Sequence, residues 1–187
     1  MSEPVFRPAT VEDLEPLHAL ITRAYRGDAA RLGWTHEADL LDGQRTDVEA
    51  LREVVEAADK VILMAHHGGV LIGCVMLTRQ DDGSAYLGML SVDPLRQSSG
   101  LGRRLLVVAE REAASRFGAA RIEMTVIRQR PELIAWYERR GYALTGATAD
   151  FPMDDERFGL PKRRDLQFVV LAKALQGQPS APSGSEP

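Results

Sequence analysis

The chain of 187 residues has a single cysteine, Cys74, and no apolar run long enough to span a membrane. One cysteine excludes a disulfide within the chain, and a membrane-spanning helix needs about 20 mostly apolar residues. Residues 1–7 also lack the apolar stretch of a secretory signal peptide. We therefore expect a protein of the reducing cytoplasm with no membrane partner.

An excess of positive charge is also missing. The sequence has 23 Lys and Arg against 27 Asp and Glu, a formal net charge of −4, whereas nucleic-acid-binding proteins usually carry a basic excess. DNA and RNA are therefore not expected as partners. The histidines have no cysteine or histidine at metal-ligand spacing, so no metal site is expected. Cys74 lies in an apolar run, which favours a core position over a nucleophile.

The length and composition suit one folded domain. Hydrophobic residues make up 44% of the chain and charged residues 27%, which is ordinary for a soluble globular protein with a sizeable core. From Gly177 onward the sequence is Gly, Pro, Ser, Ala and Gln with one Glu, and it cannot bury enough apolar surface to fold. We expect a single domain over residues 1–175 and a disordered tail over residues 176–187.

Hydrophobic periodicity predicts alternating strands and helices. The expected strands cover residues 5–7, 60–65, 70–80, 86–92, 121–127, 142–147 and 165–171, and the expected helices cover residues 10–25, 47–58, 100–117 and 131–140. Pro16 leaves the first helix start open, because Asp13 as the cap puts it in the first turn whereas Thr10 as the cap implies a kink. A helical crossover between residues 92 and 121 makes its two strands parallel, while short turns make the preceding strands antiparallel. A sheet of this mixed kind can split beside the loop that follows the central strand and admit a ligand.

The segment from Gln97 to Gly102 reads QSSGLG and lies between a buried strand that ends at Asp93 and Pro94 and a helix that begins near Gly100. A helix start offers unpaired N–H groups and the positive end of its dipole, and glycines let a phosphate approach the backbone. Small hydroxyl side chains add donors, and Arg103 follows directly. We call residues 97–103 the anion cradle and expect it to hold a pyrophosphate.

Two common phosphate-binding motifs do not fit the anion cradle, because the sequence lacks G-x-x-x-x-G-K-[ST] and the third glycine of G-x-G-x-x-G. The remaining pattern, Q-x-x-G-x-G after a strand ending in Val-Asp-Pro, resembles the acetyl-CoA motif of the GNAT superfamily, the GCN5-related N-acetyltransferases. The alternative is a helix start whose glycines merely suit a turn. A second landmark is the segment LIAWYERRGY over residues 133–142, which is similar to the A-x-x-x-Y-x-x-x-G-F helix of many acetyltransferases.

The resemblance covers Val5 to Leu175 and implies an α/β (α+β) fold, with a central mixed, mostly antiparallel six- to seven-stranded sheet flanked by about four helices. It implies transfer of an acetyl group from acetyl-CoA to a primary amine, which we expect to belong to a small molecule, and it makes a homodimer possible. Two alternatives remain open: a non-catalytic acyl-CoA-binding or regulatory module, and a protein or peptide N-acetyltransferase.

The resemblance also implies roles for individual residues. Tyr137 matches the tyrosine that donates to the departing sulfur, although it could merely pack its helix onto the sheet. The residues implied in cofactor binding are Leu90, Ser91, Val92, Gln97, Ser98, Ser99, Gly100, Leu101, Gly102, Arg103 and Leu133. The residues implied in acceptor binding are Trp34, Thr35, Glu37, Asp39 and Arg45. Glu37 and Glu123 are candidates for a general base, and Arg128 replaces an asparagine often found after the fifth strand.

Overall fold

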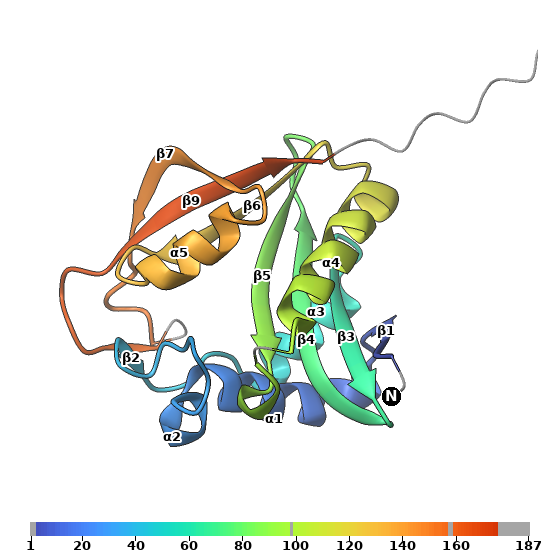
Figure 1. Ribbon diagram of the computed structural model, residues 1–187, viewed down its shortest axis with the longest axis horizontal. Coiled ribbons are helices and arrows are strands. Elements are labelled where there is room, and N and C mark those ends of the chain that lie inside the picture. Colours follow the sequence, from blue (N-terminus) through green and yellow to red (C-terminus); the bar gives the residue numbers. More distant parts are fainter. Residues whose placement is uncertain (1–2, 98, 157–158, 176–187) are drawn as a thin grey trace, which may run out of the picture.

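The computed structural model describes residues 3–97, 99–156 and 159–175, which form a mixed sheet covered by helices on both faces (Figure 1). The sheet has the strand order β1-β3-β4-β5-β6-β9-β7. Its strands are β1 (Val5–Pro8), β3 (Lys60–His67), β4 (Val70–Arg79), β5 (Ser84–Val92), β6 (Arg121–Ile127), β7 (Ala143–Asp150) and β9 (Gln167–Ala174). The longer helices are α1 (Leu14–Tyr25), α3 (Val48–Glu56), α4 (Leu101–Phe117) and α5 (Pro131–Glu138). The predicted fold class and the order of its main elements are confirmed.

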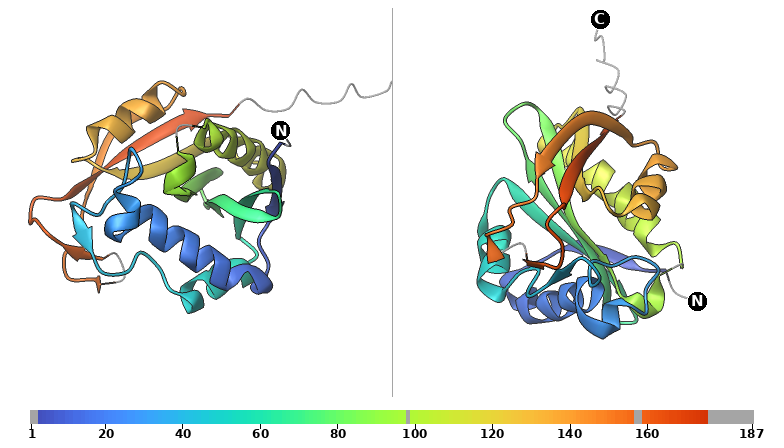
Figure 2. Two further views of the ribbon diagram at one scale, coloured as in Figure 1. Left: turned by 60° about the horizontal axis from the view of Figure 1, so that its bottom comes forward. Right: turned by 90° about the vertical axis from the view of Figure 1, so that its left-hand side faces the viewer.

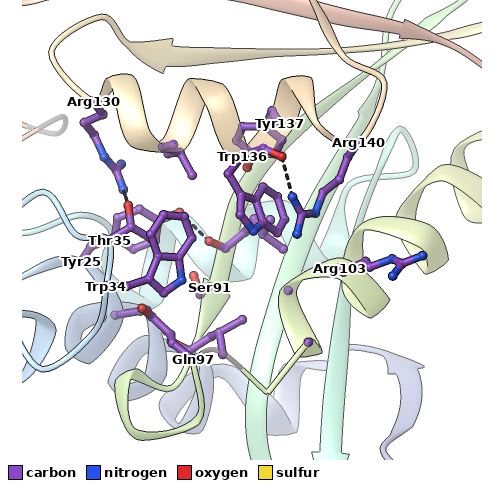
Figure 3. Close-up of a pocket in the computed structure, with 16 residues that line it drawn as sticks. Tyr25, Trp34, Thr35, Ser91, Gln97, Arg103, Arg130, Trp136, Tyr137 and Arg140 are labelled. Carbon is purple, nitrogen blue, oxygen red and sulfur yellow. Dashed lines mark hydrogen bonds between the residues drawn. The ribbon is translucent and has the colours of Figure 1, made fainter.

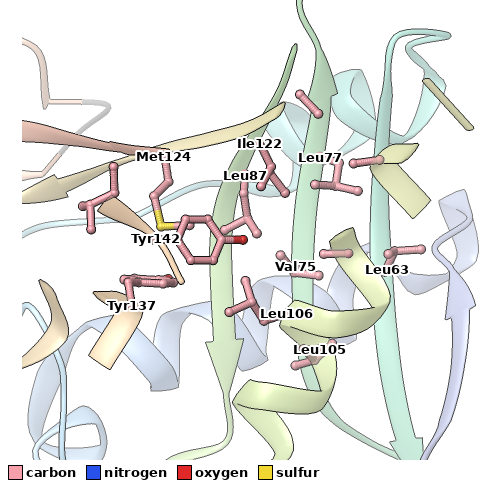
Figure 4. Packing of buried hydrophobic residues seen from close by; sticks show 14 of the residues in the cluster. Leu63, Val75, Leu77, Leu87, Leu105, Leu106, Ile122, Met124, Tyr137 and Tyr142 are labelled. Carbon is pink, nitrogen blue, oxygen red and sulfur yellow. The ribbon is translucent and has the colours of Figure 1, made fainter. Parts of the chain in front are cut away.

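Both faces of the central part of the sheet are buried. Alternate residues of β3 point in opposite directions, so Val61, Leu63 and Ala65 join the cluster under α4 while Ile62 and Met64 join the cluster under α1 and α3. Figure 4 shows the first of these clusters, where leucines of α4 pack onto β3, β4 and β5. Figure 2 shows α1 and α4 on opposite sides of the sheet.

The sheet splits between β5 and β6, as the sequence predicts. These two parallel strands pair only where Ser84–Tyr86 meets Arg121–Glu123, and they diverge beyond that point (Figure 1). The pairing of β5 with β4 is also irregular opposite Met89, whose φ is 48°, a left-handed value that is uncommon for a residue other than glycine. The carboxyl-terminal half of β5 therefore has one edge without a partner strand.

The start of α1 resolves the alternative at Pro16. Residues Val11–Asp13 form a 3₁₀ turn and Asp13 occupies the N-cap of α1, which puts Pro16 in the first turn. No backbone hydrogen bond is lost there, because the first N–H groups of a helix have no intrahelical acceptor.

The loops contain further short elements, among them the single turn α2 (Gly27–Ala30) and the two-residue strands β2 (Leu41–Asp42) and β8 (Leu160–Pro161), which pair with each other. Strands as short as β2 and β8 contain no full period of hydrophobicity, so the sequence pattern does not predict them. The pairing brings the long loop after β7 against the loop after α1.

Within the described ranges, every helix is too short or too polar to cross a lipid bilayer. The same part of the chain brings no three His, Cys, Asp or Glu side chains together as a metal site would require. The predicted tail, residues 176–187, lies outside the described residues.

Candidate active site

The anion cradle is the loop between β5 and α4. Gly100 is the N-cap of α4 with φ 80°, a conformation that favours glycine, and the first helical hydrogen bond runs from the Arg104 N–H to the Gly100 carbonyl (3.1 Å). The N–H groups of residues 101–103 precede that bond and are free to meet an anion. The side chain of Leu101 is buried in the core. The buried Leu101 side chain thus packs the start of α4 onto the core, while the Leu101 backbone faces the loop.

Gly102 leaves space at the helix start. A Cβ atom built on this residue would lie 3.5 Å from the Trp136 ring and 3.8 Å from a methyl group of Val92, which are ordinary contact distances. Glycine is therefore not needed at this position to avoid a clash within the protein. Its missing side chain instead leaves the helix backbone open to a ligand.

Two arginines without carboxylate partners among the described residues lie beside the cradle, Arg103 and Arg140 (Figure 3). The guanidinium of Arg140 lies 3.5 Å from the centre of the Trp136 ring and donates to the Trp136 carbonyl (2.6 Å), while its Nε is buried without a hydrogen-bond partner in the described chain. Burial lowers the pKa of Arg140, and the neighbouring charges of Arg139 and Arg103 lower it further. A bound anion would stabilise the charged form of Arg140 against both effects. The sequence analysis missed Arg140.

A cavity of about 230 Å³, here called the first cavity, runs from the cradle to α5 (Figure 3). Most of the sequence-predicted site residues line it. They are Trp34, Thr35, Leu90, Ser91, Val92, Gln97, Gly100, Gly102, Arg103, Leu133 and Tyr137. Segments more than 100 residues apart in the sequence therefore meet at one site.

Some predicted residues lie elsewhere. Ser99 is exposed and its hydroxyl donates to the Arg96 carbonyl (2.6 Å), and Asp39 is exposed and ion-paired with Arg31 (3.1 Å). Neither lines the first cavity. Ser98 lies outside the described residues. The roles proposed for these three residues stay predictions.

The open edge of β5 presents backbone groups to the first cavity. The Asp93 N–H bonds the Ile72 carbonyl on β4 (3.0 Å), so strand alternation turns the Val92 N–H toward the opposite, open edge. The Leu90 carbonyl on that edge accepts a hydrogen bond from the Tyr25 hydroxyl (2.9 Å), and the Val92 carbonyl accepts one from Gln97 Nε2 (3.4 Å). Tyr25 gave no signal in the sequence, because its contact with Leu90 joins positions 65 residues apart.

Tyr137 lines the first cavity from α5. Its side chain is 5% exposed, and its ring makes edge contacts with Trp136 (5.0 Å between centroids) and Tyr142 (5.6 Å). Its hydroxyl has no hydrogen-bond partner among the described residues, and burial raises the pKa of Tyr137 above its usual value. The phenol is therefore neutral and can donate to a ligand.

A second cavity of about 140 Å³ lies where β5 and β6 diverge, and it shares Tyr25, Leu90, Arg130, Leu133 and Tyr137 with the first. The two cavities are therefore adjacent, and Tyr137 lines both of them.

The second cavity contains a buried charge network centred on Glu37. One carboxylate oxygen of Glu37 accepts a hydrogen bond from Arg26 (2.7 Å), and the other accepts one from Arg130 (3.1 Å). Arg130 also donates a hydrogen bond to the Thr35 hydroxyl (2.6 Å). Burial alone would raise the pKa of this carboxyl, but the guanidiniums of Arg130, Arg45 and Arg26 outweigh it and hold the pKa below its usual range. Glu37 is therefore ionised and a weak base.

The other base candidate lies outside both cavities. Glu123 is paired with Arg121 (2.7 Å) on the part of β6 that joins β5. Arg128, which replaces the family's asparagine, donates to the side chain of Gln167 (3.0 Å) and also lines neither cavity. Among the described residues, Glu37 is thus the one carboxylate lining either cavity.

The comparisons with known proteins identify the family. A family model described as "Acetyltransferase (GNAT) family" matches residues 17–142, more than half of the chain. The chain belongs to the GNAT acetyltransferase family. Membership of the family does not identify the acceptor of this protein. A comparison with curated protein sequences gave no match.

Solved structures of GNAT acetyltransferases share the fold at low sequence identity. The ribosomal-protein-alanine N-acetyltransferase of Brucella melitensis is 22% identical with a TM-score of 0.67, covering 91% of this chain and 99% of that one. The acetyltransferase yncA of Salmonella typhimurium, solved with its cofactor acetyl-CoA, is 20% identical with a TM-score of 0.67, covering 98% and 100%. A spermidine N-acetyltransferase SpeG chimera from Vibrio cholerae and hSSAT is 16% identical with a TM-score of 0.66, covering 93% and 96%.

Both tryptophans of the chain, Trp34 and Trp136, line the first cavity, with ring centroids 6.3 Å apart. We expect acetyl-CoA to change the intrinsic tryptophan fluorescence, because a ligand entering this cavity alters the surroundings of both indoles. A fluorescence titration measures the change, and Trp34→Phe should reduce its amplitude. A titration that leaves the emission unchanged while calorimetry records binding would place the ligand elsewhere.

Proposed function

We propose that this acetyltransferase transfers an acetyl group from acetyl-CoA to the primary amine of a small molecule. The observation that carries the proposal is that two cavities share Tyr137 in their lining, one beginning at the anion cradle and one lined by charged side chains. Two substrates entering from different sides could react at this point. A cytoplasmic location, a homodimer, and a single domain followed by a disordered tail stay predictions.

The residues of the first cavity fit acetyl-CoA. The free N–H groups at the start of α4, the space beside Gly102, and the guanidiniums of Arg103 and Arg140 suit a pyrophosphate. The open edge of β5 offers the Val92 N–H to an extended arm, in the manner of an added strand. Acetyl-CoA would supply an activated thioester to this site.

Tyr137 would assist the departure of sulfur. The amine nitrogen bonds to the acetyl carbon, the carbon–sulfur bond breaks, the nitrogen loses one proton and the sulfur gains one. Full proton transfer from a phenol of pKa about 10 to a thiolate of pKa about 8.5 is uphill by roughly 2 kcal/mol. Since burial raises the pKa of Tyr137, its hydroxyl is better suited to hydrogen-bond the developing thiolate than to surrender its proton outright.

The amine must arrive neutral or lose its proton in the site. A lysine-like amine of pKa about 10.4 carries a handicap of roughly 4.6 kcal/mol at pH 7. Glu37 is poorly suited to remove that proton, because both of its oxygens accept hydrogen bonds from arginines. An acceptor of lower pKa would meet the requirement without a base from the protein.

The test is release of CoA from acetyl-CoA in the presence of a panel of amines. We expect CoA release that requires an amine and yields the acetylated product, measured by thiol detection and mass spectrometry. Tight binding of acetyl-CoA with no product from any amine would favour the non-catalytic binding module. Product from peptides alone would favour the protein N-acetyltransferase.

A further inference from the structure

The second cavity carries an excess of positive charge. Arg45 and Arg130 line it, and Glu37 is the one carboxylate among its described lining residues. The carboxylate is shared by Arg130 and by Arg26, so it is already neutralised by two guanidiniums. Arg45 lies over the Tyr25 ring (5.2 Å to its centroid) and forms no ion pair in the described chain, although its charge also acts on Glu37. An anionic group on a ligand would balance this excess positive charge.

The same arrangement disfavours an acceptor with a second positive charge. A polyamine needs carboxylates to receive its remaining ammonium groups, and both oxygens of Glu37 accept hydrogen bonds from arginines. An additional ammonium would lie near Arg45 and Arg130 in a partly desolvated cavity, where like charges repel more strongly than in water.

We propose that the acceptor is a small amine that also carries a carboxylate, as in an amino acid, and that Arg45 binds this carboxylate. The proposal rests on the proposed acetyl transfer at the same site. A guanidinium matches a carboxylate with two parallel hydrogen bonds, which fixes orientation as well as position. The side chains of Phe151 and Phe168, with ring centroids 5.2 Å apart, also line the cavity. They offer an apolar wall to the rest of the acceptor molecule. A cavity of about 140 Å³ suits a compact acceptor.

The experiment compares acceptors that differ only in the anion. L-leucine and L-leucinamide present an α-amine on the same side chain and backbone carbon. The amine of the amide is more readily deprotonated, which by itself would favour L-leucinamide over L-leucine. We expect kcat/KM to favour L-leucine by roughly 10- to 100-fold, the range given by one charge-assisted hydrogen-bonded pair. Equal use of both compounds, or better use of spermidine than of L-leucine, would overturn the inference and leave acetyl transfer standing.

Variants assign the preference to Arg45. Arg45→Gln should abolish the preference for L-leucine by raising the KM for this acceptor, with the KM for acetyl-CoA unchanged, and Arg45→Lys should retain part of the preference. The matched control is Arg116→Gln, which removes an exposed arginine that pairs with Glu112 on α4 outside both cavities and should keep the full preference. An Arg45→Gln variant that keeps the full preference would contradict the assignment.

Calorimetry with CoA-bound protein separates the inference from the proposed function. Tighter binding of L-leucine than of L-leucinamide without any turnover would support the anion site and overturn acetyl transfer. Equal or absent binding of both compounds would overturn the anion site, whatever the protein's activity toward other amines.

Discussion

Replacing Tyr137 with phenylalanine should lower kcat by about 10²- to 10⁴-fold, the loss typical of a positioned proton or hydrogen-bond donor. The KM for acetyl-CoA should change much less, because the ring keeps its edge contacts with Trp136 and Tyr142. The fold should also persist, since the hydroxyl has no partner among the described residues that its removal would leave unsatisfied. Steady-state kinetics on the purified variant measure both constants.

Tyr142→Phe is the matched control for this prediction. The Tyr142 hydroxyl is also largely buried, but it donates to Glu110 (3.0 Å) and lines neither the first nor the second cavity. Its loss should leave kcat close to the wild-type value. An acyl donor with a more acidic thiol should partly restore Tyr137→Phe, because a better leaving group needs less assistance. Full activity of Tyr137→Phe, with chemistry limiting the rate, would reduce Tyr137 to a packing residue.

Replacing Gly102 with valine should weaken acetyl-CoA binding by about 100-fold, equivalent to roughly 2.7 kcal/mol. The valine side chain would occupy the space in front of the free N–H groups of α4 and hold a pyrophosphate away from them. A Cβ at this position meets Trp136 and Val92 at ordinary contact distances, and glycine is a poorer helix former than valine, so we expect the folded state to persist. Isothermal calorimetry measures the affinity.

Two further variants make the Gly102 prediction specific. Gly102→Ala should give a smaller loss of affinity, because it adds one methyl group. Gln97→Ala should also do less, since Gln97 acts through a long hydrogen bond to the Val92 carbonyl (3.4 Å). A thermal melting temperature of Gly102→Val equal to or above that of the wild type, without ligand, would show that the fold is intact. Unchanged affinity for acetyl-CoA in that intact variant would reject the anion cradle.

The helix start at Gly100 could be predicted from sequence because its requirements are local, whereas anion binding there stays a prediction. Gly100 needs a left-handed φ, Gly102 needs an open approach to the backbone, and both fall within one turn of a helix whose apolar stripe is plain. The β5–β6 split was predictable for a similar reason, since a helical crossover dictates parallel strands.

The residues that the sequence analysis missed depend on contacts between distant segments. Arg130 reaches the cavities from the start of α5 and meets Glu37 across 93 positions of the chain. Glu37 looked like a possible base in the sequence, but a pattern of residue types does not reveal that two arginines hold its carboxylate. Tyr25 likewise ends an ordinary amphipathic helix, and its hydroxyl reaches Leu90 only through the fold.

The unpaired edge of β5 has a consequence for how the molecule avoids aggregation. A free strand edge is normally a template for pairing with another chain, which natural proteins prevent by covering or charging it. Here the edge borders cavities closed by side chains from α1 and α5, including Tyr25 and Tyr137. A slender extended ligand can reach the backbone of β5 through such a space, whereas a whole strand of another protein cannot. The fold thereby offers strand-like hydrogen bonding to a small molecule while withholding it from neighbouring polypeptides.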